Sequence, residues 1–591
     1  MIRSIGPTTS RLSLNKSVMS TFSLVCICLF VTIGCGTSDE IQSAPSSVDA
    51  SSATADAGTS TPAADLSDEV YDDSRIMQID LVLEEKDWDT LRRQKRTWST
   101  LFGGQCLDKP FSSPFTWFKA NVTIDGEFYE QIEVRKKGFL GSMDSERPSL
   151  KLDLGEVVSE QAHKGVRHFT LNNSKQDPTL VRQCLAYGLF RAAGIAAPRC
   201  AYARISVNAR SLGVYVLIEP IKKAFLERNF GDASGALFEG AISDFTEKMS
   251  ATFEAKNSAA EQSSLADVIS AIEAPDDQLE EALSAVMDVD AFIKYWATEV
   301  MIGHGDGYTS NRNNFYLYRD KGLWRFIPWG VDAVLGPNKA FNVEALPVFW
   351  GGALAYRVYS HPDLRARYKT QLETLVKDLW DSDALVDEVK RVRTLIGPWL
   401  TDKQQGEFMQ KAMTELIAHL PLRRQALLKW IEDGLPALGE PVPAPECLVK
   451  KGQISVSFTT TWGSLQSAPE GWFDGLTQMS LFLEGESLPI TASVSPAGLG
   501  WDGPGILWLG FFEGGEFVTI WLQVDPDEMA ANATLTVEAI ALYTDENKGI
   551  KDEFIGTVPG KLTITSADLS QPQGIKGSFE GDILWFPDAK K

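Results

Sequence analysis

The sequence predicts an α+β protein in which a domain of mixed sheet and helices precedes an all-β, sandwich-like domain. Over residues 75–440, strand-like alternation and amphipathic helical spacing follow one another. Over residues 447–591, short strand patterns are separated by turn residues. A length of 591 residues exceeds one domain at about 150 residues each. A content of 44% hydrophobic and 23% charged residues is typical of globular domains with sizeable cores.

The formal net charge of −23 excludes nucleic acid as the main partner, because nucleic-acid-binding proteins need a basic surface. The excess acidity lies at the two ends of the chain. Residues 36–74 contain nine acidic residues and no basic residue, and residues 446–591 contain twenty acidic residues and eight lysines. The region between them is nearly balanced, with a net charge of −5. The acidic ends therefore favour roles in spacing and solubility, and the arginine-containing middle is where function is expected.

Residues 1–35 are predicted to be a lipoprotein signal peptide. A basic segment precedes the apolar run Phe22–Ile33, which is short for a membrane span of about 20 residues but suits a signal peptide. Residues 31–35 (VTIGC) resemble a bacterial lipobox, although Thr32 replaces the usual Leu. We expect an exported lipoprotein, anchored to the cell envelope on its periplasmic or surface face by lipid on Cys35. The alternative is ordinary signal cleavage nearby, with Cys35 unmodified.

The segment after Cys35 is predicted to be a disordered tether. Residues 36–74 consist mainly of Ser, Ala, Thr and Asp, and large apolar side chains are almost absent. Such a segment buries too little surface to offset its chain entropy. A lipid-anchored cysteine followed by a flexible spacer would hold a folded domain away from the membrane.

Four cysteines remain in the body of the chain, Cys106, Cys184, Cys200 and Cys447. They contain no CxxC pair, so a structural zinc site is not expected. An exported compartment permits disulfides. The sequence leaves their pairing open, and buried thiols are an equal alternative.

The elements of residues 75–440 are expected in a defined order. Strand patterns, two of them joined by the hairpin signal Asp125-Gly126, cover residues 75–83, 117–124, 128–135, 147–154, 168–172, 200–207 and 213–219. Helical patterns cover residues 84–94, 178–193, 265–301 and 362–433, and a strand pair covers 315–318 and 323–328. Asp177 is expected to cap the second helix. The simplest arrangement is a mixed sheet with one helix packed on it, followed by a helical lobe.

Residues 441–446 (PVPAPE) mark a linker to the C-terminal region. Alternating runs at residues 453–460, 479–483, 506–511, 517–524 and 534–543 favour an antiparallel β-sandwich. Six tryptophans lie here: Trp462, Trp472, Trp501, Trp508, Trp521 and Trp585. They suggest a face that binds sugar or protein, although core packing explains most of them. The acids Asp525, Asp527 and Glu528 are either a Ca²⁺ site or a solvated turn, and the solvated turn is favoured.

One set of residues in the middle region has the chemistry of phosphoryl transfer. The glycine-bearing turn at residues 136–142 would let backbone N–H groups approach phosphate oxygens, and Lys151 on the next strand would add positive charge. Asp306 and Asn311 have the D-x4-N spacing of a kinase catalytic loop, where the Asp orients the attacking hydroxyl and the Asn binds metal. Asp332 follows two strands later, like the acid that bridges Mg²⁺ to the phosphates. D-x4-N alone is a weak signal, and the order of the set makes it informative.

In the same order, residues 76–430 resemble the CotH kinase family, named for spore coat protein H. The resemblance is carried by the segments VRKKGFLGS, RPSLKLDL, HFTLNNSKQDPTLVRQCLAYGLFRAAGI, SLGVYVLIEPI, FLERNFGDASGALFEG, HGDGYTSNRNNFYLY and WRFIPWGVD. It covers more than half of the chain and is more specific than any single motif. It implies an atypical protein-kinase-like fold, ATP and Mg²⁺ as cofactors, and transfer of phosphate to Ser or Thr hydroxyls of an exported protein substrate.

Carried over residue by residue, the resemblance makes Lys151 the phosphate-contacting lysine and Asp306 the catalytic-loop acid. Asn311 and Asp332 would be the metal ligands. The other cofactor-binding residues that it implies are Gly138, Gly141, Ser142 and, without an assigned role, Glu219.

Two departures from the family pattern bear on activity. The family usually reads P-W-D-x-D where residues 328–332 read PWGVD, so Gly330 replaces the first acid. It commonly has an acid where this chain has Gln183, which forms no ion pair with a lysine. The leading hypothesis is a membrane-anchored protein kinase. The alternative is a catalytically impaired surface protein of the same fold, acting in adhesion or surface assembly, and a weaker third hypothesis is a carbohydrate-binding lipoprotein that uses the β-domain.

Other polar residues beside these motifs have simpler explanations. Residues 135–137 (RKK) are either a solvated run or additional phosphate contacts. Asn313 and Asn314 are expected as turn residues. His304 is expected to be a loop histidine bonded to backbone rather than a catalytic base.

Overall fold

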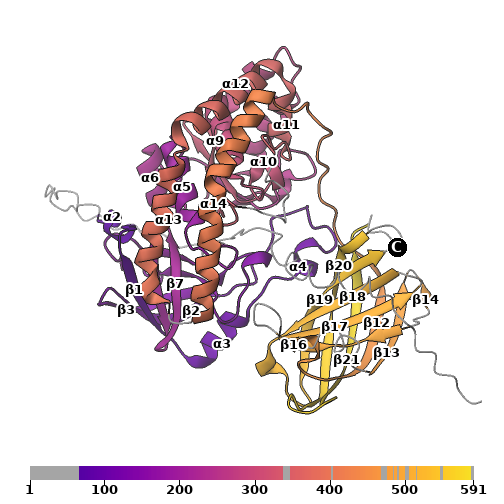
Figure 1. Cartoon of the computed structure of the whole chain (residues 1–591). Coiled ribbons are helices and arrows are strands. Elements are labelled where there is room, and N and C mark those ends of the chain that lie inside the picture. Colours follow the sequence, from indigo (N-terminus) through magenta and orange to yellow (C-terminus); the bar gives the residue numbers. More distant parts are fainter. Residues whose placement is uncertain are drawn as a thin grey trace, which may run out of the picture. The chain divides into compact units, whose positions relative to one another are not determined.

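The computed structural model describes residues 66–336, 346–400, 403–466, 476–483, 485–488, 492–499, 505–513, 516–545 and 550–587. These residues form two units, shown in Figure 1: a large unit of residues 66–96 and 106–445, and a β unit of residues 97–105 and 446 onward. The α+β fold class with a C-terminal all-β unit is confirmed. Cys35 and most of the expected tether lie outside the described residues. Among the described helices, none has the length and hydropathy of a membrane span.

Seven strands of the large unit close into a barrel with the order β1-β2-β3-β4-β5-β7-β6. They are β1 (Ile76–Val82), β2 (Phe118–Ile124), β3 (Glu127–Lys137), β4 (Ser149–Asp153), β5 (His168–Asn172), β6 (Cys200–Val207) and β7 (Arg210–Ile218). The pairing of β1 with β6 is parallel, and the other neighbours are antiparallel. The expected mixed sheet is therefore closed, through a pairing between strands far apart in sequence that local alternation does not reveal.

The barrel has an apolar interior and a polar strip on part of its outer face. Val134, Leu150 and Leu171 belong to the interior core. Because side chains alternate along a strand, residues on either side of these point outward. Two rows of cross-strand neighbours result, Lys137–Ser149–Asn172 and Arg135–Lys151–Thr170. The candidate site is built on this strip.

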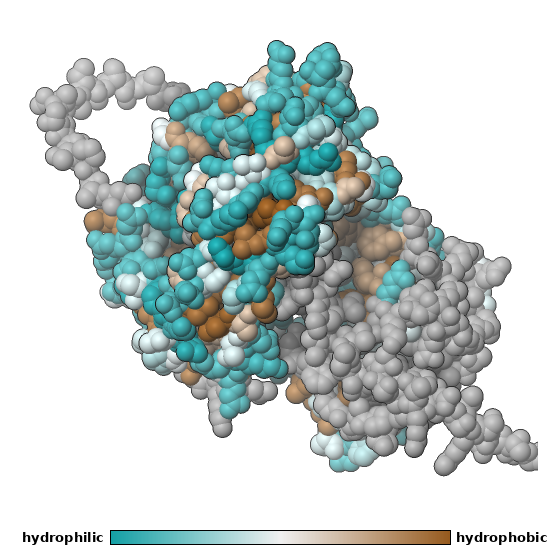
Figure 2. Space-filling view, turned by 45° about the horizontal axis from the view of Figure 1, so that its top comes forward, coloured by the Kyte–Doolittle hydropathy of each residue, from teal (hydrophilic) through white to brown (hydrophobic). Residues whose placement is uncertain are grey.

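The rest of the large unit is mainly helical and surrounds a second sheet. The helices are α2 (Ser67–Val70), α3 (Glu85–Arg93), α5 (Arg182–Ala192), α6 (Lys223–Phe230), α7 (Ala266–Ile272), α8 (Leu279–Val286), α9 (Val289–Ile302), α10 (Tyr308–Asn311), α11 (Ala353–Ser360), α12 (Pro362–Thr374), α13 (Ser382–Ile396) and α14 (Lys403–Asp433). The sheet has the order β11-β10-β8-β9, with β8 (Leu237–Gly240), β9 (Glu254–Ala255), β10 (Phe315–Asp320) and β11 (Leu323–Pro328). The short strands β8 and β9 were not expected. On the face in Figure 2, hydrophilic residues cover most of this unit, with apolar patches between them.

The end of the expected tether is folded, which corrects its predicted boundary at residue 74. Residues 66–74 contain α2, and Val70 and Tyr71 are buried in the barrel core cluster. The guanidinium of Arg199 lies 4.6 Å from the centre of the Tyr71 ring. These two buried side chains help to hold an otherwise acidic segment against the unit.

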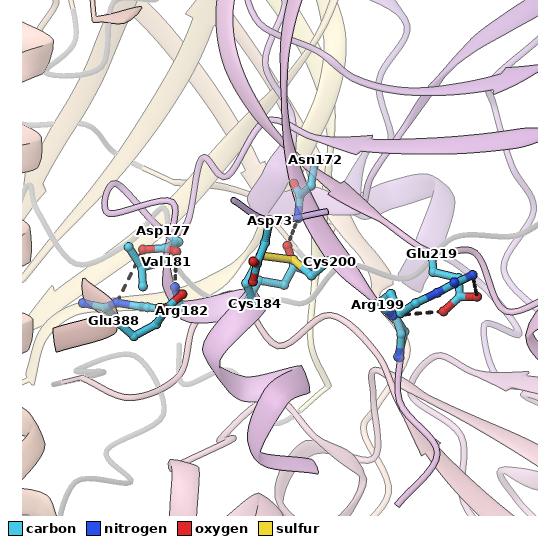
Figure 3. The surroundings of a disulfide bond; sticks show 12 residues. Asp73, Asn172, Asp177, Val181, Arg182, Cys184, Arg199, Cys200, Glu219 and Glu388 are labelled. Atoms are coloured by element: carbon cyan, nitrogen blue, oxygen red, sulfur yellow. Dashed lines mark hydrogen bonds and ion pairs between the residues drawn. A yellow bond between two sulfur atoms is a disulfide. The ribbon is translucent and has the colours of Figure 1, made fainter. Parts of the chain in front are cut away.

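A disulfide joins α5 to the barrel. Cys184 on α5 is bonded to Cys200 at the start of β6, as Figure 3 shows. The helix begins at Arg182, whereas the sequence predicted a start at residue 178. Asp177 caps it. One carboxylate oxygen of Asp177 accepts from the backbone N–H of Arg182 at 2.9 Å. The alternative of buried thiols is therefore wrong for this pair.

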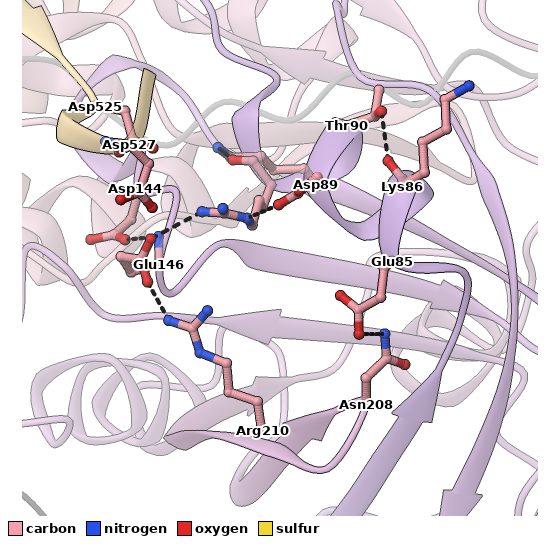
Figure 4. Close-up of polar contacts among 12 residues, drawn as sticks. Glu85, Lys86, Asp89, Thr90, Asp144, Glu146, Asn208, Arg210, Asp525 and Asp527 are labelled. Carbon is pink, nitrogen blue, oxygen red and sulfur yellow. Dashed lines mark hydrogen bonds and ion pairs between the residues drawn. The ribbon is translucent and has the colours of Figure 1, made fainter. Parts of the chain in front are cut away.

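Helix α3 is held against the turn between β6 and β7. Asn208 in this turn donates to the carboxylate of Glu85 at 2.9 Å, and its own carbonyl accepts from the backbone N–H of Leu83 at 3.1 Å. Figure 4 shows the Asn208–Glu85 contact together with the ion pair between Arg210 and Glu146. These contacts hold helix α3 and the segment after the glycine-bearing turn against the hairpin of β6 and β7.

The β unit is one antiparallel sheet with the order β14-β13-β12-β21-β20-β19-β18-β17-β15, in which β16 also pairs with β17. Its strands are β12 (Val449–Thr460), β13 (Leu476–Leu483), β14 (Glu486–Leu488), β15 (Ala492–Val494), β16 (Ala497–Leu499), β17 (Gly505–Glu513), β18 (Glu516–Val524), β19 (Thr534–Asp545), β20 (Ile550–Ala567) and β21 (Ile575–Trp585). The expected sandwich is thus one continuous sheet. Strands β20 and β21 were missed because glycines and Pro559 interrupt their alternation.

Helix α4 (Trp98–Phe102) belongs to the β unit although it precedes most of the large unit in sequence. The carboxylate of Glu538 accepts from the backbone N–H groups of Trp98 at 2.5 Å and Ser99 at 2.7 Å. The ring of Trp98 lies 4.5 Å from that of Phe554 on β20. A segment from the N-terminal half of the chain therefore completes this unit.

The tryptophans of the β unit mainly serve its packing. Trp508 and Trp585 are buried, and Trp462 and Trp521 are half-buried. Trp472 and Trp501 lie outside the described residues. Asp525 caps a short turn by accepting from the backbone N–H of Asp527 at 3.0 Å. No group of three or more His, Cys, Asp or Glu suited to a metal occurs among the described residues, and the choice between a Ca²⁺ site and a solvated turn stays a prediction.

Candidate active site

Asp306 lies buried in the loop between α9 and α10, where three asparagine amides converge on its carboxylate. Asn311 and Asn313 donate to Oδ1 at 2.6 and 3.2 Å, and Asn314 donates to Oδ2 at 2.8 Å. The two residues selected by D-x4-N spacing are thus in direct contact. Asn313 and Asn314, expected as turn residues, join the same acid. The carboxylate is held in one orientation from three sides.

A residue that the sequence interpretation missed, Glu299, organises this loop from α9. Its carboxylate accepts from the backbone N–H groups of Tyr308 and Thr309, both at 3.0 Å, and from the hydroxyls of Thr309 at 2.6 Å and Tyr295 at 2.7 Å. It thereby caps α10. Gly307 must be glycine here, because a Cβ would lie 2.3 Å from Glu299 Oε1. An acid inside an otherwise apolar helical face was the signal available in the sequence.

Asp332 lies buried at the outer strip of the barrel. The amide of Asn172 lies 3.4 Å from its Oδ2 and donates to the side-chain carbonyl of Gln183 at 2.9 Å. The carbonyl oxygen of Asn172 accepts from the hydroxyl of Ser149 at 3.3 Å. Gln183 therefore has a defined place in the site as an acceptor that orients Asn172.

The two acids influence each other electrostatically. Burial raises the pKa of Asp306 to about 7, and the negative charge of Asp332 adds to this increase. Burial also raises the pKa of Asp332 to about 6, while the positive charge of Lys137 opposes that rise. Two buried carboxylates close enough to repel each other are a favourable place for a cation.

The charge of Lys137 acts on Asp332 and opposes the rise of its pKa. This lysine lies buried at the end of β3, and its neighbours Arg135 and Lys136 are buried too, so the interpretation of residues 135–137 as a solvated run is wrong. Lys136 points to the other side and donates to the backbone carbonyl of Arg92 at 2.6 Å. Burial lowers the pKa of Lys136 to about 7. Lys151 lies in the next row of the strip, where it lines a cavity.

This cavity has a volume of about 860 Å³, within the range of about 300–1,000 Å³ that is common for ligand sites. Its basic lining residues, apart from one histidine, are Lys151, Arg167, Arg199, Lys222, Lys223, Arg228 and Lys256. Its acidic lining residues are Glu219 and Glu227. A strongly basic cavity in an acidic protein favours an anionic ligand.

Trp329 connects the cavity to the Asp306 loop. Its side chain lines the cavity beside Tyr316, with 5.6 Å between the ring centres. Its backbone N–H donates to the carbonyl of Asn314 at 3.1 Å, and Asn314 in turn holds Asp306. The basic cavity and the acidic loop therefore adjoin each other.

The glycine-bearing turn is closed on itself. The hydroxyl of Ser142 accepts from the backbone N–H of Phe139 at 3.1 Å, and the carbonyl of Ser142 accepts from the amide of Asn173 at 3.1 Å. Gly138 has a φ of +131°, and a Cβ there would lie 2.5 Å from Ser142 Oγ. Gly141 is buried in the same turn. The contacts of Ser142 thus give it a role in shaping the turn, and phosphate binding by Gly138, Gly141 and Ser142 stays a prediction.

Glu219 is engaged by arginines. Its carboxylate accepts from Arg199 at 2.8 Å and pairs with Arg228 (Figure 3 shows its contact with Arg199). All three residues line the cavity. Glu219 therefore positions two cavity arginines, a role that the sequence left unassigned.

Gly330, which stands where the family has its first acid, packs against the Asp306 cluster. Its φ is +55°, and a Cβ would lie 2.3 Å from Asn314 Oδ1. An aspartate at this position would displace Asn314. The absence of that acid therefore agrees with the packing at position 330, where Asn314 leaves no space for a side chain.

His304 is not suited to proton transfer. It is buried, and burial lowers the pKa of its imidazole to about 3, so the ring stays neutral at physiological pH. The expectation that it is not a catalytic base agrees with this placement.

The donor set around Asp306 and Asp332 fits a hard cation. All its groups are oxygens, and the buried side-chain carbonyl oxygens of Asn313 and Asn314 have no hydrogen-bond partner. Mg²⁺ prefers oxygen ligands and usually binds through one or two carboxylates completed by substrate phosphates. Two carboxylates are therefore sufficient, although the described residues contain no three-residue cluster of His, Cys, Asp or Glu.

The family model and the curated relatives agree with the sequence resemblance. Residues 134–427 match the family described as CotH kinase protein. Inner spore coat protein H of Bacillus subtilis (strain 168) is 25% identical over 257 residues, which cover 40% of this chain and 70% of that protein. Invasin CotH7 of Rhizopus delemar is 22% identical, over 41% of this chain and 44% of that protein. A solved structure, the Helicobacter pylori proinflammatory kinase CtkA, is 11% identical with a TM-score of 0.21, covering 48% of this chain and 92% of that one.

Proposed function

We propose, from the premise that residues 134–427 belong to the CotH kinase family, that the chain transfers phosphate from ATP to Ser or Thr hydroxyls of exported proteins. The observation that carries the proposal is the buried pair of acids, Asp306 and Asp332. Burial raises the pKa of each acid, and the negative charge of Asp332 raises the pKa of Asp306 further. Burying such a pair destabilises the fold unless a bound cation or protonation offsets the charge, and groups of this kind are common at functional sites.

In this proposal Asp306 holds the hydroxyl that attacks the phosphate. A general base works best when its pKa is near the operating pH, and a pKa of about 7 meets this condition. The amides of Asn311 and Asn314 donate to the two oxygens of the carboxylate and fix its orientation. Mg²⁺, when bound by Asp332 and Asn311, would neutralise the phosphates of ATP.

The basic cavity supplies the place for the nucleotide. Lys151 and the arginines that Glu219 positions would attract its phosphates. Lys137, beside Asp332, would lie nearer the phosphate that is transferred. Gln183 replaces the acid that is common in the family and works here through Asn172, so it needs no ion pair with a lysine.

The test uses residues 36–591, purified and incubated with labelled ATP and Mg²⁺. Autophosphorylation and label transfer to a mixture of exported proteins are measured together with ATP binding. We expect Asp306→Asn to lower transfer by about three orders of magnitude, since positioning and proton transfer are both lost. Asp332→Asn should weaken Mg²⁺-dependent nucleotide binding.

The matched control is Asp232→Asn. Asp232 is an exposed acid of the large unit whose side chain caps a turn at Ser234. It should leave transfer and nucleotide binding unchanged. A wild-type chain that binds no ATP and transfers no label, to itself or to the mixture, contradicts the kinase proposal.

A non-catalytic role is the second candidate, and Gly330 is the observation that favours it. Invasin CotH7 of Rhizopus delemar shares 22% identity with this chain, so a surface-binding protein of this fold is the natural alternative. Such a protein would act in adhesion or surface assembly and would keep its fold when Asp306 is replaced. Unchanged surface binding by Asp306→Asn, with no phosphate transfer by the wild type, would support it.

We also propose that the chain is an exported lipoprotein anchored through Cys35. The apolar run and the lipobox-like residues 31–35 support this, and the Cys184–Cys200 disulfide suits an oxidising compartment. Labelling cells with a fatty-acid analogue should mark the wild type and not Cys35→Ser. Equal labelling of the two proteins would contradict lipid attachment at Cys35.

A further inference from the structure

Residues 66–73, which we call the strap, lie far upstream of the family-matched residues 134–427 and nevertheless reach the cavity. Ser67 and Tyr71 are among the residues that line it, together with Lys151 and Arg199. Both strap residues are buried. The strap is therefore a part of the cavity wall rather than a free end of the tether.

The strap is fixed by charges from three other elements. Arg199 donates to the hydroxyl of Ser67 at 3.0 Å and pairs with Asp68 at 2.5 Å. Lys164 pairs with Glu69 at 2.6 Å. Arg391 on α13 donates to the backbone carbonyl of Asp73 at 2.9 Å. The segment thus spans from the barrel to a helix of the helical body, on the side where the cavity lies.

One arginine links the strap to the groups that would meet phosphate. Arg199 contacts Ser67, Asp68 and the ring of Tyr71, and it also pairs with Glu219. Glu219 pairs in turn with Arg228, which lines the cavity. A change in the position of the strap would therefore move two cavity arginines.

We infer that the strap is part of the nucleotide site, with Ser67 and Tyr71 as contacts to bound nucleotide and as the elements that keep Arg199 in position. This inference rests on the proposed function, because it takes the ligand of the cavity to be ATP. The nucleotide-binding unit then begins at residue 66, and the residues that determine affinity include some outside the family-matched domain.

The first test is hydrogen–deuterium exchange of residues 36–591 with and without Mg²⁺-ATP. We expect the nucleotide to slow exchange in the strap, in β4 around Lys151 and in residues 220–228. Slower exchange in β4 and residues 220–228 with an unchanged strap would overturn the inference and leave the proposed function intact. No change in any of these segments would contradict the proposed function itself.

The second test is nucleotide affinity by calorimetry. Ser67→Trp places a bulky side chain in the cavity wall and should weaken Mg²⁺-ATP binding by about ten-fold or more. Ser74→Trp adds the same side chain just after the strap, at an exposed position that does not line the cavity, and should leave affinity unchanged. Equal affinities for the two variants would overturn the inference.

A third variant covers the case in which Ser67→Trp fails to fold, as judged by its melting curve. Tyr71→Leu keeps an apolar side chain in the barrel core and removes the ring beneath Arg199. We expect a several-fold loss of affinity in a protein that stays folded, with a lower melting temperature because part of a buried ring is lost. Wild-type affinity in a folded Tyr71→Leu protein would also contradict the inference.

Discussion

The two units differ in the kind of polar side chain that they bury. The large unit buries charged groups, among them Lys137, Glu299, Asp306 and Asp332. In the β unit, the buried polar side chains among the described residues are hydroxyls: Thr460, Ser464, Ser495, Thr519, Thr544 and Thr557. A hydroxyl is satisfied by one neighbouring carbonyl, whereas a buried charge costs several kcal/mol unless it is paired.

This difference indicates where a functional site is expected. In the large unit, Asp306 and Asp332 influence each other electrostatically, and their pKa values are shifted toward neutrality. Strongly shifted groups in such a cluster are typical of functional sites. The described buried side chains of the β unit are apolar residues and hydroxyls, and its buried tryptophans contribute to packing.

The largest stability effect is expected from the disulfide of the large unit. Replacing Cys184 and Cys200 by Ser opens a loop with a sequence separation of 16. The cost should be about 3 kcal/mol, the entropy of closing a loop of about 15 residues. Urea unfolding measures the loss, and hydrogen exchange locates it in α5 and β6. An equal rise of hydrogen exchange in β12 would contradict the expectation that the loss of stability is confined to the large unit.

A matched pair of glutamates tests the comparison more directly. Glu299 caps α10 inside the large unit, and Glu538 caps α4 in the β unit, each through two backbone N–H groups. Glu299→Gln should cost about 2 kcal/mol, because its four donors would meet an amide that is itself a donor. Glu538→Gln should cost about 1 kcal/mol, as for an ordinary cap. Only the first should also lower phosphate transfer, and equal effects on transfer would remove the distinction between the units.

Restoring the family's acid should harm this chain. Gly330→Asp puts a Cβ against Asn314 Oδ1, so we expect a loss of about 1.5 kcal/mol from overpacking and lower transfer. Gly322→Asp, at a turn glycine with positive φ and open space around it, is the matched control for backbone strain. Higher activity in Gly330→Asp would contradict this expectation and show that the first acid of the family pattern supplies a ligand that the wild-type site lacks.

The smallest effect is a dependence of the melting temperature on pH. The folded pKa values of about 7 for Asp306 and about 6 for Asp332 lie above the ordinary value of 3.8. Between these values the folded chain binds more protons than the unfolded chain, so stability falls as pH rises. Without divalent cations, the melting temperature should drop by a few degrees from pH 5 to pH 8.

Two controls test whether Asp306 and Asp332 cause the fall of melting temperature with pH. The double variant Asp306→Asn, Asp332→Asn should flatten it. Asp582 in the β unit has a lowered pKa through its hydrogen bond from Lys450, so its contribution has the opposite sign and is lost as pH falls. A slope that persists unchanged in the double variant would place its origin elsewhere.

Much of the local structure was predictable, because it depends on near neighbours. The patterns predicted β1 to β7, α3, α9, β10 and β11 to within a few residues. Spacing also selected Asp306 and Asn311, which are in direct contact. The long strands β20 and β21 were not predicted, since their glycines and Pro559 break the alternation while their neighbours supply the pairing.

The site was predictable only in part, because its electrostatics come from residues distant in sequence. Lys137 acts on Asp332 across nearly two hundred positions, and Lys136, its neighbour, faces the other way. Glu299 was hidden in an apolar helix, and its role follows from four donors that the loop brings to it. No pattern within a window of residues contains this information.

The sequence alone predicted the class of fold, the resemblance to the CotH kinase family, and Asp306 and Asp332, two acids that the fold brings close enough to influence each other. Alternation, helical spacing and motif order are properties of short stretches, and they survive without any knowledge of packing. The tertiary structure decided that the charge of Lys137 acts on Asp332, that Glu219 positions two cavity arginines, and that the strap joins the cavity wall. These facts depend on barrel closure and burial, because only packing brings distant charges together and removes water from around them.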